Sequence, residues 1–202
     1  MSLELFDEPQ ALPMPDAEVL YWPQPPLDID AGETLAQLVD ETQWRQDDVK
    51  IFGKTYAQPR LHAWHGDADS QYTYSGLTLQ PEPWTPLLQT LRNAVSKVSG
   101  ASFNSVLLNL YRDGRDSMGM HADDERELGP NPVIASLSFG EERVLTFKHR
   151  QRRELESVKL PLGHGSLLLM RGATQHHWKH GIAKLSRSCG PRLNLTFRQV
   201  NP

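Results

Sequence analysis

The sequence predicts a mainly β domain, a sandwich or barrel of antiparallel strands with two helices packed outside it. After Ser102, short runs of β-forming residues follow one another, separated by turn-forming clusters. Before that point, residues 32–47 and 82–99 carry apolar side chains at helical spacing. Several short strands at such intervals are typical of a sandwich or a barrel.

The N-terminal stretch differs from the rest of the chain. It contains six prolines, and its apolar residues follow neither the helical nor the strand period, so we expect a loosely structured arm over residues 1–30. Its apolar residues Leu20, Tyr21 and Trp22 are candidates to pack against the remainder. A single domain without internal repeats is expected over residues 31–202.

The remaining predicted elements are two helices and a series of short strands. Both predicted helices bear one apolar face, and Gly100 supplies a stop for the second. Residues 49–79, between them, are rich in aromatic residues, glycine and β-formers, which predicts short strands and exposed loops. The strands expected after Ser102 are 103–111, 133–139, 144–148, 158–160, 166–170 and 193–200.

Composition bounds the class of protein. With 202 residues, 38 % hydrophobic and 23 % charged, the chain is globular rather than disordered. No stretch approaches the roughly 18 to 20 apolar residues of a membrane span, and no secretory signal is evident. The single cysteine, Cys189, has no partner for an internal disulfide. We therefore expect a soluble cytoplasmic protein that is neither secreted nor bound to membranes, and nothing in the sequence demands more than a monomer.

The net charge of −4 is unevenly divided along the chain. Residues 1–48 hold twelve Asp or Glu and one basic residue, whereas residues 49–202 hold 20 Lys or Arg against 13 Asp or Glu. The larger part is therefore basic enough to approach phosphate groups, although many ordinary domains show a similar asymmetry.

One short segment has metal-ligand spacing. His121 and Asp123 stand two residues apart, so on an extended strand both side chains point to the same face and can bind one ion. Residues 175–180 offer further imidazoles at His176, His177 and His180. Two imidazoles and one carboxylate on one face of an octahedron hold non-haem Fe(II) for oxygen chemistry. The alternative is that these are unrelated surface residues, because His-x-Asp is common by chance.

The segment 192–198 alternates strictly between apolar and polar residues. Because guanidinium pairs with carboxylate through two parallel hydrogen bonds, two arginines on one strand face suit a dicarboxylate. A solvent-exposed edge face is the alternative. The polar face carries Arg192, Asn194, Thr196 and Arg198.

These motifs together resemble the AlkB family of iron and 2-oxoglutarate dioxygenases, and they are most similar to its duplex-DNA-repair branch. The resemblance covers residues 51–200 and implies a double-stranded β-helix (jelly-roll) core. It rests on His121-x-Asp123, His180, Arg192-x-Asn194-x-Thr196-x-Arg198, Tyr74-Ser75-Gly76-Leu77, Asn109-x-Tyr111, Asp123-Asp124-Glu125 and Leu160-Pro161-Leu162.

The resemblance implies a role for each matching position. His121, Asp123 and His180 would bind Fe(II), which leaves His176 and His177 as non-ligands. Arg192 would pair with the distal carboxylate of 2-oxoglutarate, and Arg198 would lie near its iron-proximal end. The other positions implied in co-substrate binding are Asn109, Tyr111, Asn194 and Thr196.

The implied activity is oxidative demethylation with Fe(II), 2-oxoglutarate and O₂. The enzyme would repair N1-methyladenine and N3-methylcytosine in alkylated DNA by base flipping, releasing formaldehyde, succinate and CO₂. One alternative is an oxygenase of the same family that acts on RNA, a protein or a lipid. A non-enzymatic binding module with incidental histidines is the other.

The resemblance also implies contacts to the substrate base. Phe52 would be the base-flipping finger, or else a hairpin Phe packed in the core. Tyr74 would stack on the flipped base opposite the His121 ring, with Tyr72 on the same strand face. Glu125 would contact an exocyclic amino group, or else be a solvated loop acid; with Asp124 it would favour a cationic methylated base.

A run of basic residues would contact the DNA backbone. Six Lys or Arg occur between positions 143 and 159, as expected for a phosphate-binding hairpin. A solvated turn is the alternative, and the short loop after Lys148 leaves open whether duplex or single-stranded DNA is preferred. The expected phosphate contacts are Lys148, Arg150, Arg152 and Arg153, with Arg143, His149 and Lys159 beside them.

Overall fold

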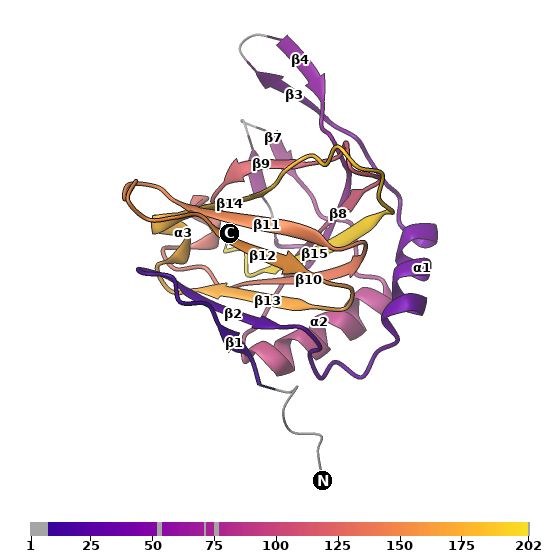
Figure 1. Ribbon diagram of the computed structural model, residues 1–202. Coiled ribbons are helices and arrows are strands. Elements are labelled where there is room, and N and C mark those ends of the chain that lie inside the picture. Colours follow the sequence, from indigo (N-terminus) through magenta and orange to yellow (C-terminus); the bar gives the residue numbers. More distant parts are fainter. Residues whose placement is uncertain (1–7, 52–53, 71, 75–76, 202) are drawn as a thin grey trace.

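The computed structural model describes residues 8–51, 54–70, 72–74 and 77–201 (Figure 1). The helices are α1 (Ala31–Glu41), α2 (Pro86–Ser99) and α3 (Thr174–His177), with a 3-10 turn at Arg126–Leu128. The strands are β1 (Gln10–Ala11), β2 (Glu18–Trp22), β3 (Asp48–Ile51), β4 (Lys54–Ala57), β5 (Leu61–Gly66), β6 (Tyr72–Tyr74), β7 (Leu77–Leu79), β8 (Ser105–Tyr111), β9 (Met118–His121), β10 (Ile134–Gly140), β11 (Arg143–His149), β12 (Val158–Leu162), β13 (Leu167–Arg171), β14 (Trp178–Ile182) and β15 (Arg192–Arg198).

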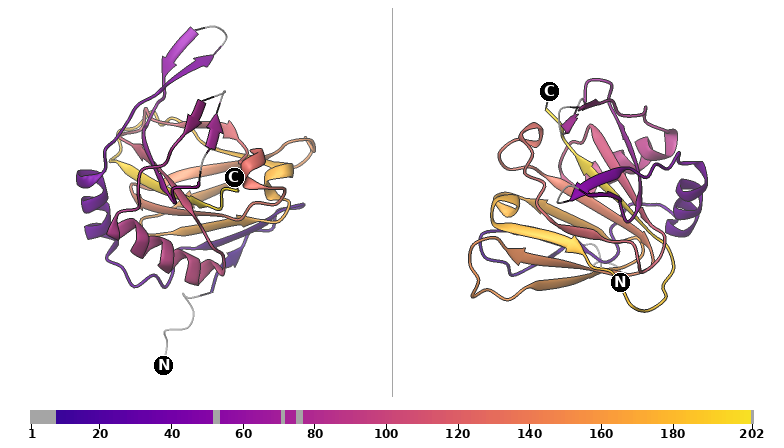
Figure 2. Two further views of the ribbon diagram at one scale, coloured as in Figure 1. Left: turned by 180° about the vertical axis from the view of Figure 1, so that it is seen from behind. Right: turned by 90° about the horizontal axis from the view of Figure 1, so that it is seen from above.

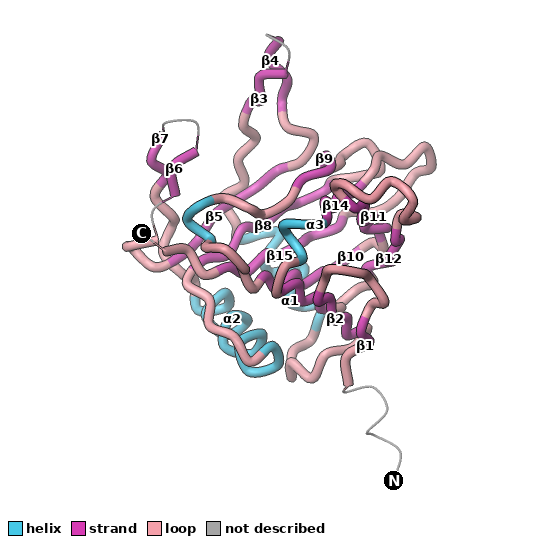
Figure 3. The backbone as a smooth tube through the Cα atoms, turned by 90° about the vertical axis from the view of Figure 1, so that its left-hand side faces the viewer, coloured by secondary structure: helices cyan, strands magenta, loops and turns pink. Residues whose placement is uncertain are grey.

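Two antiparallel sheets face each other and form the core. The major sheet has the strand order β1-β2-β13-β10-β15-β8-β5, and the minor sheet has the order β12-β11-β14-β9. Helices α1 and α2 lie on the far side of the major sheet from the minor sheet (Figure 2). The β3–β4 and β6–β7 hairpins extend beyond the two sheets (Figure 3). The mainly β fold with a double-stranded β-helix core and flanking helices is thus confirmed.

Strand β15 shows how the sequence pattern sets the layers. Leu193, Leu195 and Phe197 are fully buried in the core cluster that the major sheet forms with α1 and α2. Successive side chains of a strand point to opposite faces, so the polar residues of β15 face the minor sheet. Because β15 lies between β10 and β8, its polar face is enclosed and is not a solvent-exposed edge.

Both long helices begin at a side-chain cap. Asp30 accepts the backbone N–H of Glu33 at 2.8 Å before α1, and Thr85 accepts that of Leu88 at 3.2 Å before α2. Helix α1 ends at Glu41 rather than near residue 47, because the chain turns back and Arg45 pairs with the backbone of β5.

The N-terminal segment departs from the expected loose arm. Strand β2 pairs with β13 along its whole length, and β1 pairs with β2. Tyr21 is 8 % exposed and faces the core between the sheets, while Trp22 is 4 % exposed and faces the α-helical side. The prolines flank this strand without interrupting it, so a proline-rich stretch still holds an inner strand of the sheet.

Within the described ranges, no helix is long and apolar enough to cross a bilayer.

Candidate metal centre and co-substrate pocket

Three side chains meet where the minor sheet faces the major sheet. His121 ends β9, His180 lies in the middle of β14, and Asp123 follows β9 by two residues. The distance from Asp123 Oδ1 to His121 Nε2 is 3.8 Å, and that from Asp123 Oδ2 to His180 Nε2 is 3.9 Å. The three ligand atoms all lie within 4.8 Å of one another, so one ion can contact all three.

Both imidazoles turn Nε2 toward Asp123. His121 Nδ1 lies 2.9 Å from the Gly119 carbonyl, which can only accept, so Nδ1 carries a proton and the lone pair of the neutral ring is on Nε2. Burial lowers the pKa of His180 to about 4, although Asp123 opposes the shift, so the ring is neutral at neutral pH. His180 is thus in the protonation state of a metal ligand, and the tautomer of His121 suits one as well.

Asp123 supplies the negative charge of the centre. Its side chain is only 5 % exposed, and Arg198 Nη2 donates to Oδ1 at 2.8 Å. Burial alone would raise the pKa of this carboxyl group, but the charge of the neighbouring Arg198 guanidinium opposes burial, and the pKa is lowered. A buried carboxylate beside two imidazoles is the donor set of a facial triad, and it fits Fe(II).

The cavity beside the triad fits a dicarboxylate. Arg192 lines it and is 2 % exposed. Its Nη2 donates to Ser138 Oγ at 2.9 Å, but Nε and Nη1 are buried without a hydrogen-bond partner. The Tyr111 ring lies 5.2 Å from the Arg192 guanidinium carbon. A buried guanidinium with two unpaired donors is costly unless a ligand completes it, which a carboxylate does.

The other predicted co-substrate residues also line the cavity, but several of them already have hydrogen-bond partners in the protein. Asn109 Oδ1 accepts from Arg60 Nε at 2.8 Å. Asn194 Nδ2 donates to Ser136 Oγ at 2.7 Å, and Thr196 Oγ1 donates to Asn194 Oδ1 at 3.0 Å. Asn194 and Thr196 therefore use part of their hydrogen-bonding capacity within the cavity wall.

The structure separates the residues expected to contact phosphate. Arg143 is fully buried, and its Nη2 donates to the carbonyls of Asp116 at 3.0 Å and Ala183 at 2.6 Å. His149 is also buried. Neither can reach a phosphate, so this part of the expectation was wrong: alternation along β11 turns both side chains inward.

The remaining basic residues lie at the surface. Lys148, Arg153 and Lys159 are exposed. Arg150 Nη1 donates to Asp124 Oδ2 at 2.7 Å, and Arg152 Nε donates to Glu154 Oε1 at 2.9 Å. These two arginines are therefore partly neutralised by neighbouring carboxylates.

The base-contacting predictions are only partly covered. Phe52 lies outside the described residues, as do the side chains of Tyr72 and Tyr74, whose backbone forms β6. Glu125 precedes the 3-10 turn, and its Oε2 is buried without a hydrogen-bond partner. Asp124 is paired with Arg150, which offsets the acidic character expected of the pocket edge.

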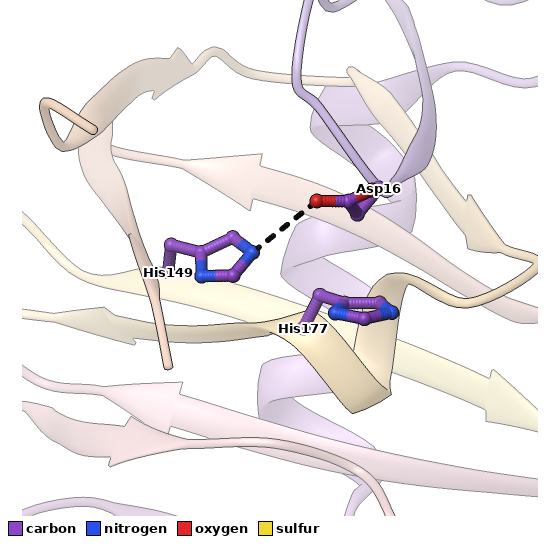
Figure 4. Close-up of side chains that lie close together, drawn as sticks. All are labelled: Asp16, His149 and His177. Atoms are coloured by element: carbon purple, nitrogen blue, oxygen red, sulfur yellow. Dashed lines mark ion pairs between the residues drawn. The ribbon is translucent and has the colours of Figure 1, made fainter. Parts of the chain in front are cut away.

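A second group with metal-ligand atoms lies outside this pocket. Asp16, His149 and His177 come from the N-terminal segment, β11 and α3, with ligand atoms within 4.8 Å of one another (Figure 4). His149 Nδ1 accepts the backbone N–H groups of Gln151 at 3.2 Å and Arg152 at 2.9 Å. The proton of the neutral ring is therefore on Nε2, which faces Asp16 at 3.6 Å and has no lone pair to give. His149 therefore offers no lone pair to a metal ion shared with Asp16.

Sequence reasoning missed one buried polar residue at the centre. Gln175 in α3 is 1 % exposed, and its Oε1 accepts the Asp123 backbone N–H at 3.0 Å. In the sequence, the only sign of this role is that Gln175 begins the histidine-rich run 175–180, which also contains the metal-ligand candidates.

Comparisons with known proteins agree with this geometry. The model of the 2OG-Fe(II) oxygenase superfamily matches residues 25–198. The protein named DNA oxidative demethylase ALKBH2 from Mus musculus is 49 % identical over 160 residues, covering 76 % of this chain and 67 % of the relative. Its Homo sapiens counterpart is 48 % identical over 158 residues, covering 75 % and 60 %. Alpha-ketoglutarate-dependent dioxygenase alkB homolog 3 from Homo sapiens is 45 % identical over 181 residues, covering 86 % and 63 %.

A solved structure supports the fold alone. It is titled "The structure of OsALKBH1" and superposes with a TM-score of 0.61 at 15 % identity, covering 95 % of this chain and 99 % of that chain. The matched regions of the relatives named above span 60 to 67 % of their own lengths. The chain belongs to the 2OG-Fe(II) oxygenase superfamily and, within it, to the AlkB family, whose cofactors are Fe(II), 2-oxoglutarate and O₂.

Proposed function

We propose that this protein is a DNA demethylase that removes methyl groups from N1-methyladenine and N3-methylcytosine. The observation that carries the proposal is a His/Asp/His triad, in which Asp123 and His180 are buried, beside a cavity in which Arg192 keeps two unpaired donors. Relatives that are 48 to 49 % identical are named DNA oxidative demethylases, which favours DNA over RNA, protein or lipid as the substrate.

In this proposal one group of residues binds the iron and another binds the co-substrate. His121, Asp123 and His180 hold the iron, and Arg198 keeps Asp123 ionised. Arg192 pairs with the distal carboxylate of 2-oxoglutarate. The cavity wall that orients the co-substrate comprises Asn109, Tyr111, Asn194 and Thr196.

Iron at this triad, with 2-oxoglutarate and O₂, supplies the oxidation that turns the N-methyl group into formaldehyde while the co-substrate becomes succinate and CO₂. The protein presents the base. A stacked base is out of reach of a buried centre, so the nucleotide must leave the stack, with Phe52 filling the gap. Tyr74 then stacks on the base opposite the His121 ring, with Tyr72 beside it.

Glu125 provides base selectivity in this proposal. Its buried Oε2 lacks a donor, and an exocyclic amino group of adenine or cytosine supplies one. Methylation at N1 of adenine or N3 of cytosine leaves the base cationic near neutral pH, so the carboxylate adds a favourable charge interaction.

Exposed Lys148 and Arg153 are proposed to contact the DNA backbone, with Arg150 and Arg152 contributing less because each already pairs with an acid. We also propose that the protein acts as a monomer in the cytoplasm. One chain supplies all three iron ligands and the whole cavity wall, so the site needs no second copy.

Formaldehyde release from an N1-methyladenine oligonucleotide with Fe(II) and 2-oxoglutarate tests this function. We expect turnover by the wild-type protein, none by His180→Ala, and wild-type turnover by His176→Ala, a matched control from the same segment. Single-stranded and duplex DNA, and the same RNA sequence, are assayed at one salt concentration. Absence of turnover on all of them, despite normal iron loading, would reject the proposal.

A further inference from the structure

The backbone around Asp123 lies outside the sheet that carries the other two ligands. Strand β9 ends at His121, whose paired partner is His180 on β14. Asp123 is two residues past this end, so no ladder hydrogen bond fixes its main chain. Its carboxylate is held by Arg198, but the position of its Cα needs a separate support.

Gln175 provides that support. Its side-chain Oε1 accepts the Asp123 backbone N–H at 3.0 Å, and this bond is buried. The other end of the amide is weakly engaged, because Nε2 faces the sulfur of Met170 at 3.5 Å. A buried amide is retained at a cost, and its one strong hydrogen bond here is to the metal-ligand segment.

Arg150 closes the connection from the other side. Its Nη1 donates to Asp124 Oδ2 at 2.7 Å and to the backbone carbonyl of Gln175 at 3.1 Å. The segment Asp123–Asp124 is therefore linked twice to Gln175 in α3, once directly through its main chain and once through the bridging side chain of Arg150.

Helix α3 is itself fixed to the major sheet. Thr174 Oγ1 donates to the Arg171 carbonyl at 2.6 Å and accepts the backbone N–H of Glu18 at 3.0 Å. Trp178, which follows the helix, donates from Nε1 to the Pro15 carbonyl at 2.8 Å. Because the turn that carries Gln175 is fixed in this way, its hydrogen bond restrains the main chain of Asp123 at one position.

We propose that Gln175 is a positioning residue that sets the geometry of the metal ligand Asp123, with Arg150 as a second brace. The inference rests on the proposed iron-binding role of Asp123. Gln175 touches neither iron nor substrate, and it acts by holding a main-chain amide. Loss of an outer hydrogen bond to a ligand typically weakens metal affinity about 10- to 100-fold.

The test is the dissociation constant for Mn²⁺, measured on the metal-free protein from the electron paramagnetic resonance of free Mn²⁺. Gln175→Met keeps the length of the side chain but removes the acceptor, and we expect the constant to rise about 10-fold. Arg150→Met is expected to raise it by less. The matched control His176→Ala, from the same helix turn and exposed, is expected to leave it unchanged.

Asp123→Ala distinguishes failure of the proposed metal site from failure of the proposed positioning role of Gln175. If Asp123→Ala leaves Mn²⁺ affinity intact, the metal site itself is wrong. If Asp123→Ala abolishes binding but Gln175→Met and Arg150→Met both bind Mn²⁺ as the wild type does, only the positioning role is overturned. Melting temperatures of the metal-free variants check folding, and the partly exposed Arg150 decides the question if Gln175→Met does not fold.

Discussion

His121 and His180 lie directly opposite each other on the paired strands β9 and β14, with their ring centroids 4.4 Å apart. The register of one strand pair therefore brings two proposed iron ligands together. A slip of one residue would place Lys179, which is exposed on the outer face, at the position of His180. The centre depends on strand pairing as much as on the identity of its ligands.

The stability of the metal-free protein should depend on pH through His180. In the unfolded chain this histidine has its ordinary pKa of 6.5, whereas burial lowers the folded-state pKa to about 4. Between these values the unfolded state binds the extra proton, so the free energy of unfolding falls as pH falls from about 6.5 to about 4. The loss amounts to roughly 3 to 4 kcal/mol at most, at about 1.4 kcal/mol per pKa unit.

Urea unfolding of metal-free wild-type protein and His180→Gln across this pH range measures the effect. The variant should lack this part of the pH dependence, whatever its absolute stability. Parallel pH profiles for the two proteins would contradict the prediction.

Arg192→Met should separate stability from co-substrate binding. Without 2-oxoglutarate the buried guanidinium has two unpaired donors, so an apolar side chain of similar length should leave the free protein equally stable or more stable. Binding of 2-oxoglutarate should weaken about 10- to 100-fold, because charged hydrogen bonds contribute about 1.5 to 3 kcal/mol. Calorimetric titration and melting curves of both proteins measure this. A large fall in melting temperature with unchanged affinity would refute it.

Arg143 and Arg153 should differ sharply although both are basic residues near the same hairpin. Arg143→Met leaves the carbonyls of Asp116 and Ala183 without their donor, at about 1 to 3 kcal/mol each, so it should destabilise the fold. Arg153→Ala, at an exposed position, should leave stability unchanged and weaken DNA binding at low salt. Unfolding curves and binding measured at several salt concentrations distinguish the two; equal effects on stability would speak against the assignment.

Metal titration should give one tight site per chain. The Asp16, His149 and His177 group is not expected to bind, because the His149 nitrogen facing Asp16 carries the proton. Asp16→Asn should therefore leave Mn²⁺ stoichiometry at one, whereas Asp123→Asn should reduce it to zero. A second equivalent that disappears in Asp16→Asn would show that the tautomer argument fails.

Much of the fold and site followed from alternation and spacing. The strict pattern of residues 192–198 predicts one apolar and one polar face, and β15 shows both. Spacing alone left His176, His177 and His180 as equal candidates. The structure brings only His180 to Asp123 and His121, because β14 pairs with β9.

Other features depend on contacts that no local pattern encodes. Strand β14 was not predicted, because Lys179 and Gly181 are residues that are depleted in strands and the segment has no run of β-forming residues. Arg143 resembles a surface arginine in sequence, and only the three-dimensional fold places the carbonyls of Asp113, Asp116 and Ala183 around it. The bond from Gln175 to Asp123 joins residues 52 positions apart.

Strand β2 occupies an edge of β13 that would otherwise be open to pairing with another chain. Without it, β13 would form the border of the major sheet, and its Leu167, Leu168, Leu169 and Met170 would offer a row of unpaired main-chain groups to any passing chain. The acidic N-terminal stretch covers this strand edge, and its negative charges repel other copies of the molecule. Shortening the protein past Trp22 would thus favour self-association through the uncovered edge of β13.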